Sequence, residues 1–330
     1  MIVLFKQKAP ANIVILFLFG LLIKLPLFIY PKVIVVPQTD GRLYTAFIHS
    51  IGGATGTGAL IASIIALFLL YVQALMVNYM INEYRLTIRQ TFLPAMAYML
   101  ITSLLPEWSY MSAVLLSNTL IILMFIILFG LYNVSTGNSK IFNIGLLAGL
   151  ASYIFFPSVF FSLSVIVGLM ILRPFRLNEV FLLLMGALTP YYFYAVYLFL
   201  NDRLVVQQFI QSLYLHPPSL QHSLWIVIAT VLLCIPFLLG GYYIQLQLRK
   251  MLIQARKNWS ILLVYLLLAF IIPFINSAPS FYTWLLAAAP FACFHACAYL
   301  YTPRKWLPSV LFTVALVFIL VQQYVSTAWQ

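Results

Sequence analysis

The sequence predicts an all-α protein, built as a polytopic bundle of transmembrane helices. Of its 330 residues, 65% are hydrophobic and only 7% are charged. Apolar stretches of roughly 15 to 25 residues recur from Ile13 to the C-terminus, and a helix needs about 20 apolar residues to cross a hydrocarbon core of about 30 Å. We therefore exclude a water-soluble fold and expect a single integral membrane domain over residues 1–330.

About eleven spans are expected along the chain. Their predicted ranges are 11–29, 57–81, 91–105, 111–132, 141–156, 158–172, 179–200, 223–247, 260–275, 281–301 and 307–326. The first span is too long for the apolar core of a cleavable signal peptide and lacks a small-residue cleavage site, so we expect it to remain as an anchor.

The positive charges predict how these spans are oriented. If the N-terminus is cytoplasmic, most of the seventeen Lys and Arg residues fall on the cytoplasmic side. That side then holds Lys6, Lys8, Arg85, Arg89, Lys140, Arg173, Arg176, Arg249, Lys250, Arg256, Lys257, Arg304 and Lys305. The positive-inside rule therefore predicts a cytoplasmic N-terminus and an extracytoplasmic C-terminus. Topology and attraction to the anionic lipids of the bilayer explain the formal net charge of +12, so we predict no nucleic-acid partner.

The cysteines and the intramembrane histidine fall inside apolar segments. Cys234, Cys293 and Cys297 are expected to pack as small hydrophobic residues. His295 lies on a different helical face from its two neighbouring cysteines, so the segment predicts no metal cluster. His295 could relay protons, but a neutral ring bonded to a neighbouring carbonyl is the favoured interpretation.

Two longer loops, 30–56 and 201–222, both lie on the predicted outer side. In the first, Asp40-Gly41 is a turn signal, and Leu43, Phe47 and Ile48 then recur at helical spacing. This pattern predicts a short amphipathic helix in the membrane interface, beginning near Arg42. Asp40 just before it is either the N-cap of that helix, which is the simpler interpretation, or a general base.

Four cations also fall on the outer side: Lys24, Lys32, Arg42 and Arg203. They could bind a phosphate or pyrophosphate at the outer leaflet, or extend to lipid headgroups. In the second loop, Asp202 beside Arg203 is most simply a solvated pair at a helix end. His216 and His222 are too few for a metal site unless His49 joins them.

Residues 140–178 form a predicted hairpin of two short spans, with small residues for close packing in Gly145-Leu146-Leu147-Ala148-Gly149-Leu150-Ala151 and a basic end in Arg173-Pro174-Phe175-Arg176. A further apolar span and an outer loop follow. This arrangement resembles the polytopic GT-C glycosyltransferases, which take a sugar from a polyprenyl-phosphate carrier at the outer leaflet. Their first outer loop carries a catalytic acid followed by an interfacial helix, and Asp40 with Tyr44 occupies the matching position.

The resemblance covers roughly residues 10–205, with 223–330 as additional C-terminal spans. It implies that Asp40 deprotonates the acceptor and that Lys24, Arg42 and Arg203 bind the carrier phosphate; a divalent metal is left open. The full set of predicted substrate-binding residues is Lys24, Lys32, Arg42, Tyr44, His49, Asp202, Arg203 and His216.

The chain also resembles a family of bacterial inner-membrane proteins to which no function is attached. Asp40 stands alone, whereas many GT-C enzymes carry paired acids in this loop. A non-catalytic scaffold or assembly subunit bound to another membrane protein is therefore the alternative prediction. A transporter is disfavoured, because the spans hold few polar groups and show no repeated halves.

Overall fold

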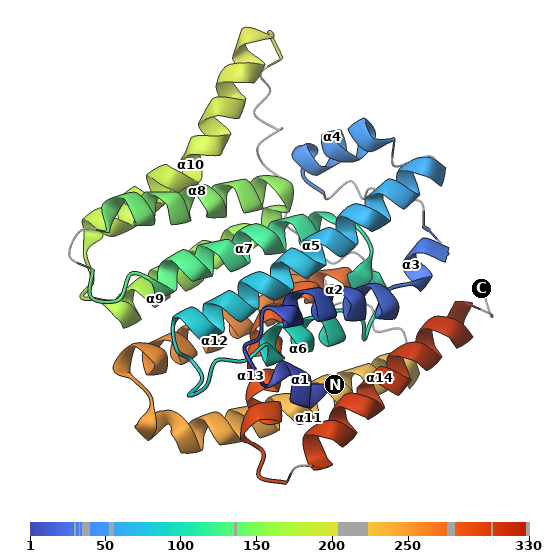
Figure 1. The fold of residues 1–330 in the computed structure, drawn as a ribbon. Coiled ribbons are helices and arrows are strands. Elements are labelled where there is room, and N and C mark those ends of the chain that lie inside the picture. The colour runs from blue at the N-terminus through green and yellow to red at the C-terminus, as the bar shows by residue number, and fades with distance from the viewer. Residues whose placement is uncertain are drawn as a thin grey trace.

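The computed structural model describes residues 1–29, 31–32, 34, 40–52, 56–134, 137–203, 224–275, 281–304 and 306–327. These residues form helices and no strand, which confirms the predicted fold class (Figure 1). The α-helices are α1 (Ile2–Phe5), α2 (Ala11–Ile23), α3 (Pro26–Ile29), α4 (Arg42–Ile51), α5 (Gly56–Glu83), α6 (Leu93–Ile101), α7 (Ala113–Phe129), α8 (Asn138–Ile154), α9 (Phe161–Leu172), α10 (Leu177–Leu200), α11 (Leu224–Gln247), α12 (Ile253–Ile271), α13 (Ala288–Tyr301) and α14 (Trp306–Thr327). Short 3₁₀ helices are η1 (Pro106–Ser109), η2 (Phe156–Phe160), η4 (Leu248–Lys250), η5 (Ile272–Phe274) and η6 (Phe281–Ala287).

Six helical segments among the described residues are long and apolar enough to cross a membrane. They are Thr57–Glu83, Leu177–Leu200, Leu224–Lys250, Ile253–Phe274, Phe281–Tyr301 and Trp306–Gln323. Shorter apolar helices cover Ala11–Ile23, Ala113–Phe129 and Phe156–Leu172. The membrane class is thus confirmed, whereas the count of about eleven full spans is not supported.

Helix α6 shows why the count differs from the prediction. Its apolar run predicted a span over 91–105, but the helix has nine residues, all of them buried. At 1.5 Å per residue it is about 14 Å long, far short of a hydrocarbon core of about 30 Å. An apolar run therefore marked a segment enclosed by other helices rather than one surrounded by lipid.

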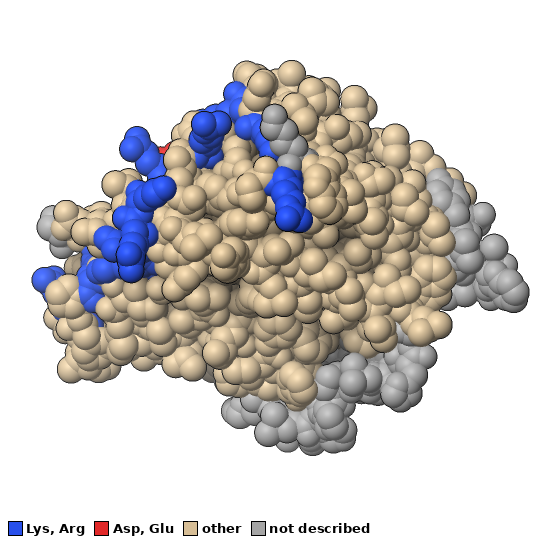
Figure 2. All heavy atoms as spheres, turned by 90° about the horizontal axis from the view of Figure 1, so that it is seen from below, with Lys and Arg blue, Asp and Glu red and all other residues tan. Residues whose placement is uncertain are grey.

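The helix ends nevertheless gather at two opposite faces. At the first face, hydrogen bonds join the helix ends and the loops beside them. These bonds are Lys8 Nζ to Gln90 Oε1 (3.0 Å), Trp259 Nε1 to Leu86 O (3.0 Å), Ile88 N to Tyr301 Oη (3.0 Å), Gln254 Nε2 to Phe129 O (3.1 Å) and Lys257 Nζ to Leu172 O (3.1 Å). We call it the basic face, because the described Lys and Arg residues predicted to be cytoplasmic lie at these ends. Figure 2 shows Lys and Arg side chains gathered over one part of the surface, while most of that view has none.

The other ends meet at what we call the opposite face. There Trp108 Nε1 donates to Phe281 O at 2.8 Å, and Gly41 N donates to Ile154 O at 2.9 Å. The first bond joins η1 to η6, and the second joins the start of α4 to the end of α8. Helix α10 extends past its neighbours on this side (Figure 1).

Helices α8 and α10 pack with their backbones in close contact. A Cβ atom at Gly145 would lie 2.1 Å from Leu183 O, and one at Gly149 would lie 2.2 Å from Ala187 O. Ser152 Oγ and Tyr191 Oη are 2.7 Å apart one turn further along both helices, so the helices run in the same direction. The small residues of 140–157 thus allow α8 to pack closely against α10, the third helix of the predicted arrangement. Figure 1 shows α8 and α10 side by side.

A polar network lies in the core between α5, α6, α7 and α12. Gln73, Tyr98 and Asn118 are each fully buried. Tyr98 Oη donates to Gln73 Oε1, and Asn118 Nδ2 donates to Tyr98 Oη at 3.0 Å and to Gln73 Oε1 at 3.2 Å. Gln73 Nε2 donates to Leu115 O (2.8 Å), and Tyr265 Oη donates to Asn118 Oδ1 (3.4 Å). The amide groups of Gln73 and Asn118 have hydrogen-bond partners, so the network joins four helices without leaving an unpaired amide in the core.

We predict that Asn118→Leu destabilises the fold by about 1–3 kcal/mol, because Tyr98, Tyr265 and Gln73 lose a shared partner inside a water-free core. Thermal unfolding in detergent measures the effect. Leu123→Ala on the same helix is the control, since that side chain is 37% exposed. A variant as stable as the parent would show that the network carries no net stability.

We predict that Gly145→Ala lowers stability by about 1–3 kcal/mol, because its methyl group forces α8 and α10 apart. Gly241→Ala is the matched control: a Cβ there meets nothing within 4 Å. Both variants exchange a helical glycine for a better helix former. Equal melting temperatures for the two variants would contradict the close-packing assignment.

Candidate functional site

Asp40 lies at the opposite face, where the chain enters α4. Its side chain is 7% exposed, and Oδ1 has no hydrogen-bond partner among the residues that the structure describes. The next residue has no room for a side chain, because a Cβ at Gly41 would lie 2.1 Å from Tyr153 O. This close approach and the hydrogen bond from Gly41 N to Ile154 O together fix the backbone beside the carboxylate.

The structure tests one of the two interpretations of Asp40, that of a helix cap. The N-cap of α4 is Gly41, and no side chain caps the helix. The interpretation of Asp40 as a helix cap is therefore wrong. A buried carboxylate oxygen without a donor costs free energy, which is typical of a group kept for another use.

Burial raises the pKa of Asp40 from about 3.8 to about 7. A general base works best when its pKa is near the pH at which it operates, since it must be ionised and still attract a proton. Asp40 therefore has two features of a general base: a carboxylate oxygen that accepts no hydrogen bond from another described residue, and a pKa close to neutrality.

Helix α4 confirms the predicted amphipathic helix. Tyr44 and Ile48 face the core, at 1% and 4% exposure, whereas Arg42 and His49 are exposed. Tyr44 Oη donates to Met111 O at 3.2 Å, so this predicted substrate-binding residue anchors α4 to the start of α7. Burial and the nearby charge of Asp40 raise the pKa of Tyr44.

A tyrosine cluster lies beside Arg42. Arg42 Nη1 is 3.5 Å from Tyr194 Oη, and the ring centre of Tyr153 lies 5.0 Å from that of Tyr194 and 5.8 Å from that of Tyr191. Sequence reasoning missed these residues. The available signal was the run Tyr191-Tyr192-Phe193-Tyr194 near the outer end of a predicted span, where aromatic residues are enriched for interfacial reasons as well.

Lys32 and Glu107 lie at the opposite face, beside η1 and η6. Lys32 Nζ lies 5.3 Å from the ring centre of Tyr110. Glu107 Oε2 accepts a hydrogen bond from Phe281 N at 2.7 Å, and burial raises its pKa despite that donor and the nearby Lys32. Glu107 thereby joins η1 to η6.

Lys24 is the most enclosed of the predicted phosphate ligands. It is 1% exposed, and its Nζ donates to Ser109 Oγ at 2.8 Å and to Thr102 O at 3.2 Å. These bonds tie the end of α2 to the turn between α6 and α7. No contact among the described residues joins Lys24 to Asp40, so its ligand role stays a prediction.

The other predicted substrate-binding residues belong to other parts of the chain than the turn that holds Asp40. Asp202 and Arg203 close the end of α10, where Asp202 has a φ of 51° and Arg203 N donates to Leu198 O at 3.0 Å. His49 is in the last turn of α4. His216 lies outside the described residues. No described contact links Asp202 or His49 to Asp40.

Within the described part of the chain, no three His, Cys, Asp or Glu residues could hold a metal ion together. The surroundings of Asp40 supply one carboxylate, which is a poor fit to the several oxygen ligands of a divalent cation. In the core, His295 Nε2 is 2.9 Å from Leu233 O. This confirms the favoured interpretation of His295 as a ring bonded to a neighbouring carbonyl.

Comparisons with family models, curated proteins and solved structures give no match to this chain.

We predict that Asp40→Asn stabilises the protein above pH 7 and has a much smaller effect near pH 5. Because the folded-state pKa is raised, the folded protein holds the proton more tightly, and stability is lost as the pH rises through about 7. Asn removes that loss, so the difference in melting temperature between variant and parent should grow by a few degrees from pH 5 to pH 8. A difference independent of pH would contradict the buried position of Asp40.

Proposed function

We propose that this protein is a GT-C-like membrane glycosyltransferase, which transfers a sugar from a polyprenyl-phosphate carrier at the outer leaflet. The observation that carries the proposal is the buried Asp40, whose Oδ1 has no partner in the described part of the chain and whose pKa is near neutrality. The amphipathic helix that follows supports it, as does the location of Lys32 and Arg42 on the same outer segment of the chain.

The proposed orientation follows from the distribution of charge. Placing the basic face in the cytoplasm satisfies the positive-inside rule, with the N-terminus inside and the C-terminus outside. Asp40 then lies at the outer leaflet, where a lipid-linked donor would present its phosphate. On this proposal the membrane is the inner membrane of a bacterium, and short helices such as α6 complete crossings within the bundle.

In the proposed reaction Asp40 Oδ1 takes the proton of an acceptor hydroxyl. The hydroxyl oxygen then bonds to the anomeric carbon of the sugar, the bond from that carbon to the carrier phosphate breaks, and the configuration inverts. The phosphate leaves with the bonding electron pair. Lys32 and Arg42 are proposed to stabilise its added charge, as charge-assisted donors do at phosphates. The tyrosines beside Arg42 offer ring faces and hydroxyls to a sugar.

We predict that Asp40→Asn lowers transfer by about 10²–10⁴-fold, the usual contribution of a general base. A strain lacking the gene, complemented with parent or variant, should be compared by mass spectrometry of envelope glycans and lipid-linked sugars. The variant should lose one glycan and accumulate its lipid-linked donor.

Glu83→Gln is the matched control, because Glu83 is an exposed acid at the other end of α5, near the basic face. It should restore the glycan fully. Full restoration by Asp40→Asn would refute the role of Asp40, and unchanged glycans in the deletion strain would refute transfer altogether.

The outer half of α10 favours a second candidate, a scaffold that binds another membrane protein. Its large side chains are exposed, among them Phe193 at 66%, Tyr197 at 62% and Phe199 at 68%. Such a surface can be covered by lipid or by a partner helix. Photocrosslinking from position 197 in the native membrane should capture one defined protein if the scaffold proposal is correct, and only lipid otherwise.

A further inference from the structure

A pocket of about 360 Å³ opens at the basic face, remote from Asp40. It lies where α7 and α9 end, α10 begins and α12 passes. Its lining consists of Tyr132, Asn133, Val134, Leu172, Arg173, Pro174, Arg176, Glu179 and Lys257. The lining holds three cations and one carboxylate, which gives the pocket a formal charge of +2.

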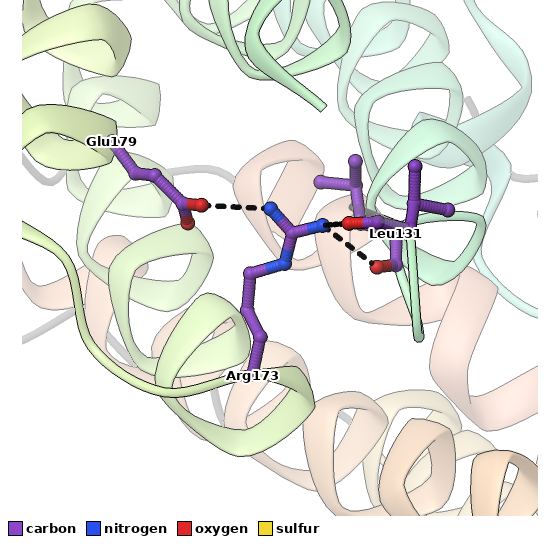
Figure 3. Close-up of polar contacts among 4 residues, drawn as sticks. Leu131, Arg173 and Glu179 are labelled. Carbon is purple, nitrogen blue, oxygen red and sulfur yellow. Dashed lines mark hydrogen bonds and ion pairs between the residues drawn. The ribbon is translucent and has the colours of Figure 1, made fainter. Parts of the chain in front are cut away.

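Arg173 and Glu179 build the wall of this pocket. Arg173 Nη1 donates to Glu179 Oε1 at 2.7 Å, and Nη2 donates to the carbonyl oxygens of Leu131 and Val134. Figure 3 shows the guanidinium group held between the start of α10 and the turn after α7. This bonding leaves Glu179 neutralised, so the carboxylate does not cancel the charge of the other cations.

Arg176 and Lys257 are the two cations of the lining that still have donors for an anionic ligand. Arg176 is exposed, and no hydrogen bond or ion pair joins its side chain to another described residue. Lys257 Nζ lies 5.3 Å from the ring centre of Tyr132 and donates one bond, to Leu172 O. An ammonium group has three donors, so two are left for an anion.

The pocket also lies beside the N-terminus of α10, a helix of 24 residues without a side-chain cap. Its first backbone N–H groups carry the positive end of the helix dipole. The helix end adds a favourable field for an anion to the charge of the two side chains.

The surroundings of the pocket indicate a lipid rather than a soluble anion. Phe175, Leu177 and Phe181 are 54%, 64% and 61% exposed along the start of α10. A phosphate in the pocket would therefore have apolar surface beside it for acyl chains. Basic pockets between membrane helices on the cytoplasmic side are typical sites for anionic headgroups.

We propose that this pocket binds the phosphate of an anionic membrane lipid through Arg176 and Lys257, with the lipid's acyl chains against α10. The site is independent of Asp40 and of sugar transfer. Its expected effect is to fix the position of α10 relative to α7, α9 and α12 in the cytoplasmic leaflet.

Native mass spectrometry of the full chain in detergent tests the proposal by titration with phosphatidylglycerol and, separately, with phosphatidylcholine. The parent should bind phosphatidylglycerol more tightly. Arg176→Gln should weaken that binding about fivefold, and Arg176→Gln with Lys257→Gln by at least twentyfold, since each cation contributes a similar attraction.

Arg249→Gln is the matched control, because Arg249 is an exposed arginine of the basic face outside the pocket lining. It should bind phosphatidylglycerol as the parent does. Equal binding by Arg176→Gln and Arg249→Gln would overturn the proposal, as would equal affinity of the parent for the two lipids. Displacement of the lipid by millimolar inorganic phosphate would identify a soluble phosphate as the ligand and overturn the lipid assignment.

Discussion

The buried network of Gln73, Tyr98, Asn118 and Tyr265 is the interaction on which the helix arrangement depends. Apolar side chains can slide past one another in a membrane protein, because lipid and protein interior are equally apolar. Amide and hydroxyl groups cannot, since each lost hydrogen bond leaves an unpaired group where no water can reach it. The network therefore fixes the relative positions of α5, α6, α7 and α12, and it requires α6 to lie inside the bundle.

The glycine contact of α8 with α10 sets the geometry around Asp40. These two helices carry the groups that meet the start of α4: Tyr153 and Ile154 at the end of α8, and Tyr194 on α10. Their relative height is set where Gly145 and Gly149 admit the backbone of α10. A packing feature in the middle of the bundle thus places a backbone acceptor for Gly41 and a hydroxyl for Arg42 at its surface.

The two faces differ in how they use charge. At the basic face, Arg173 is paired with Glu179 and with backbone carbonyls, while Arg176 stays open. At the opposite face, Asp40 is buried without an ion-pair partner among the described residues. A paired charge stabilises a junction, whereas an unpaired one leaves binding capacity for a ligand or a proton. Asp40, proposed for chemistry, and Arg176, one of the two cations proposed for lipid binding, are both of the second kind.

The sequence alone determined the membrane class, the helical content, the sorting of most Lys and Arg residues to one face and the amphipathic helix after Asp40. Each of these follows from the composition of the chain or from the spacing of residues within short segments. Only the tertiary structure decided that α6 is enclosed by other helices, that Gly41 rather than Asp40 caps α4, and that Tyr153, Tyr191 and Tyr194 lie beside Arg42. Those facts depend on contacts between residues far apart in the chain; Arg42 and Tyr194, for example, are 152 positions apart. Such contacts are set by packing and hydrogen bonding between helices, which no local pattern encodes.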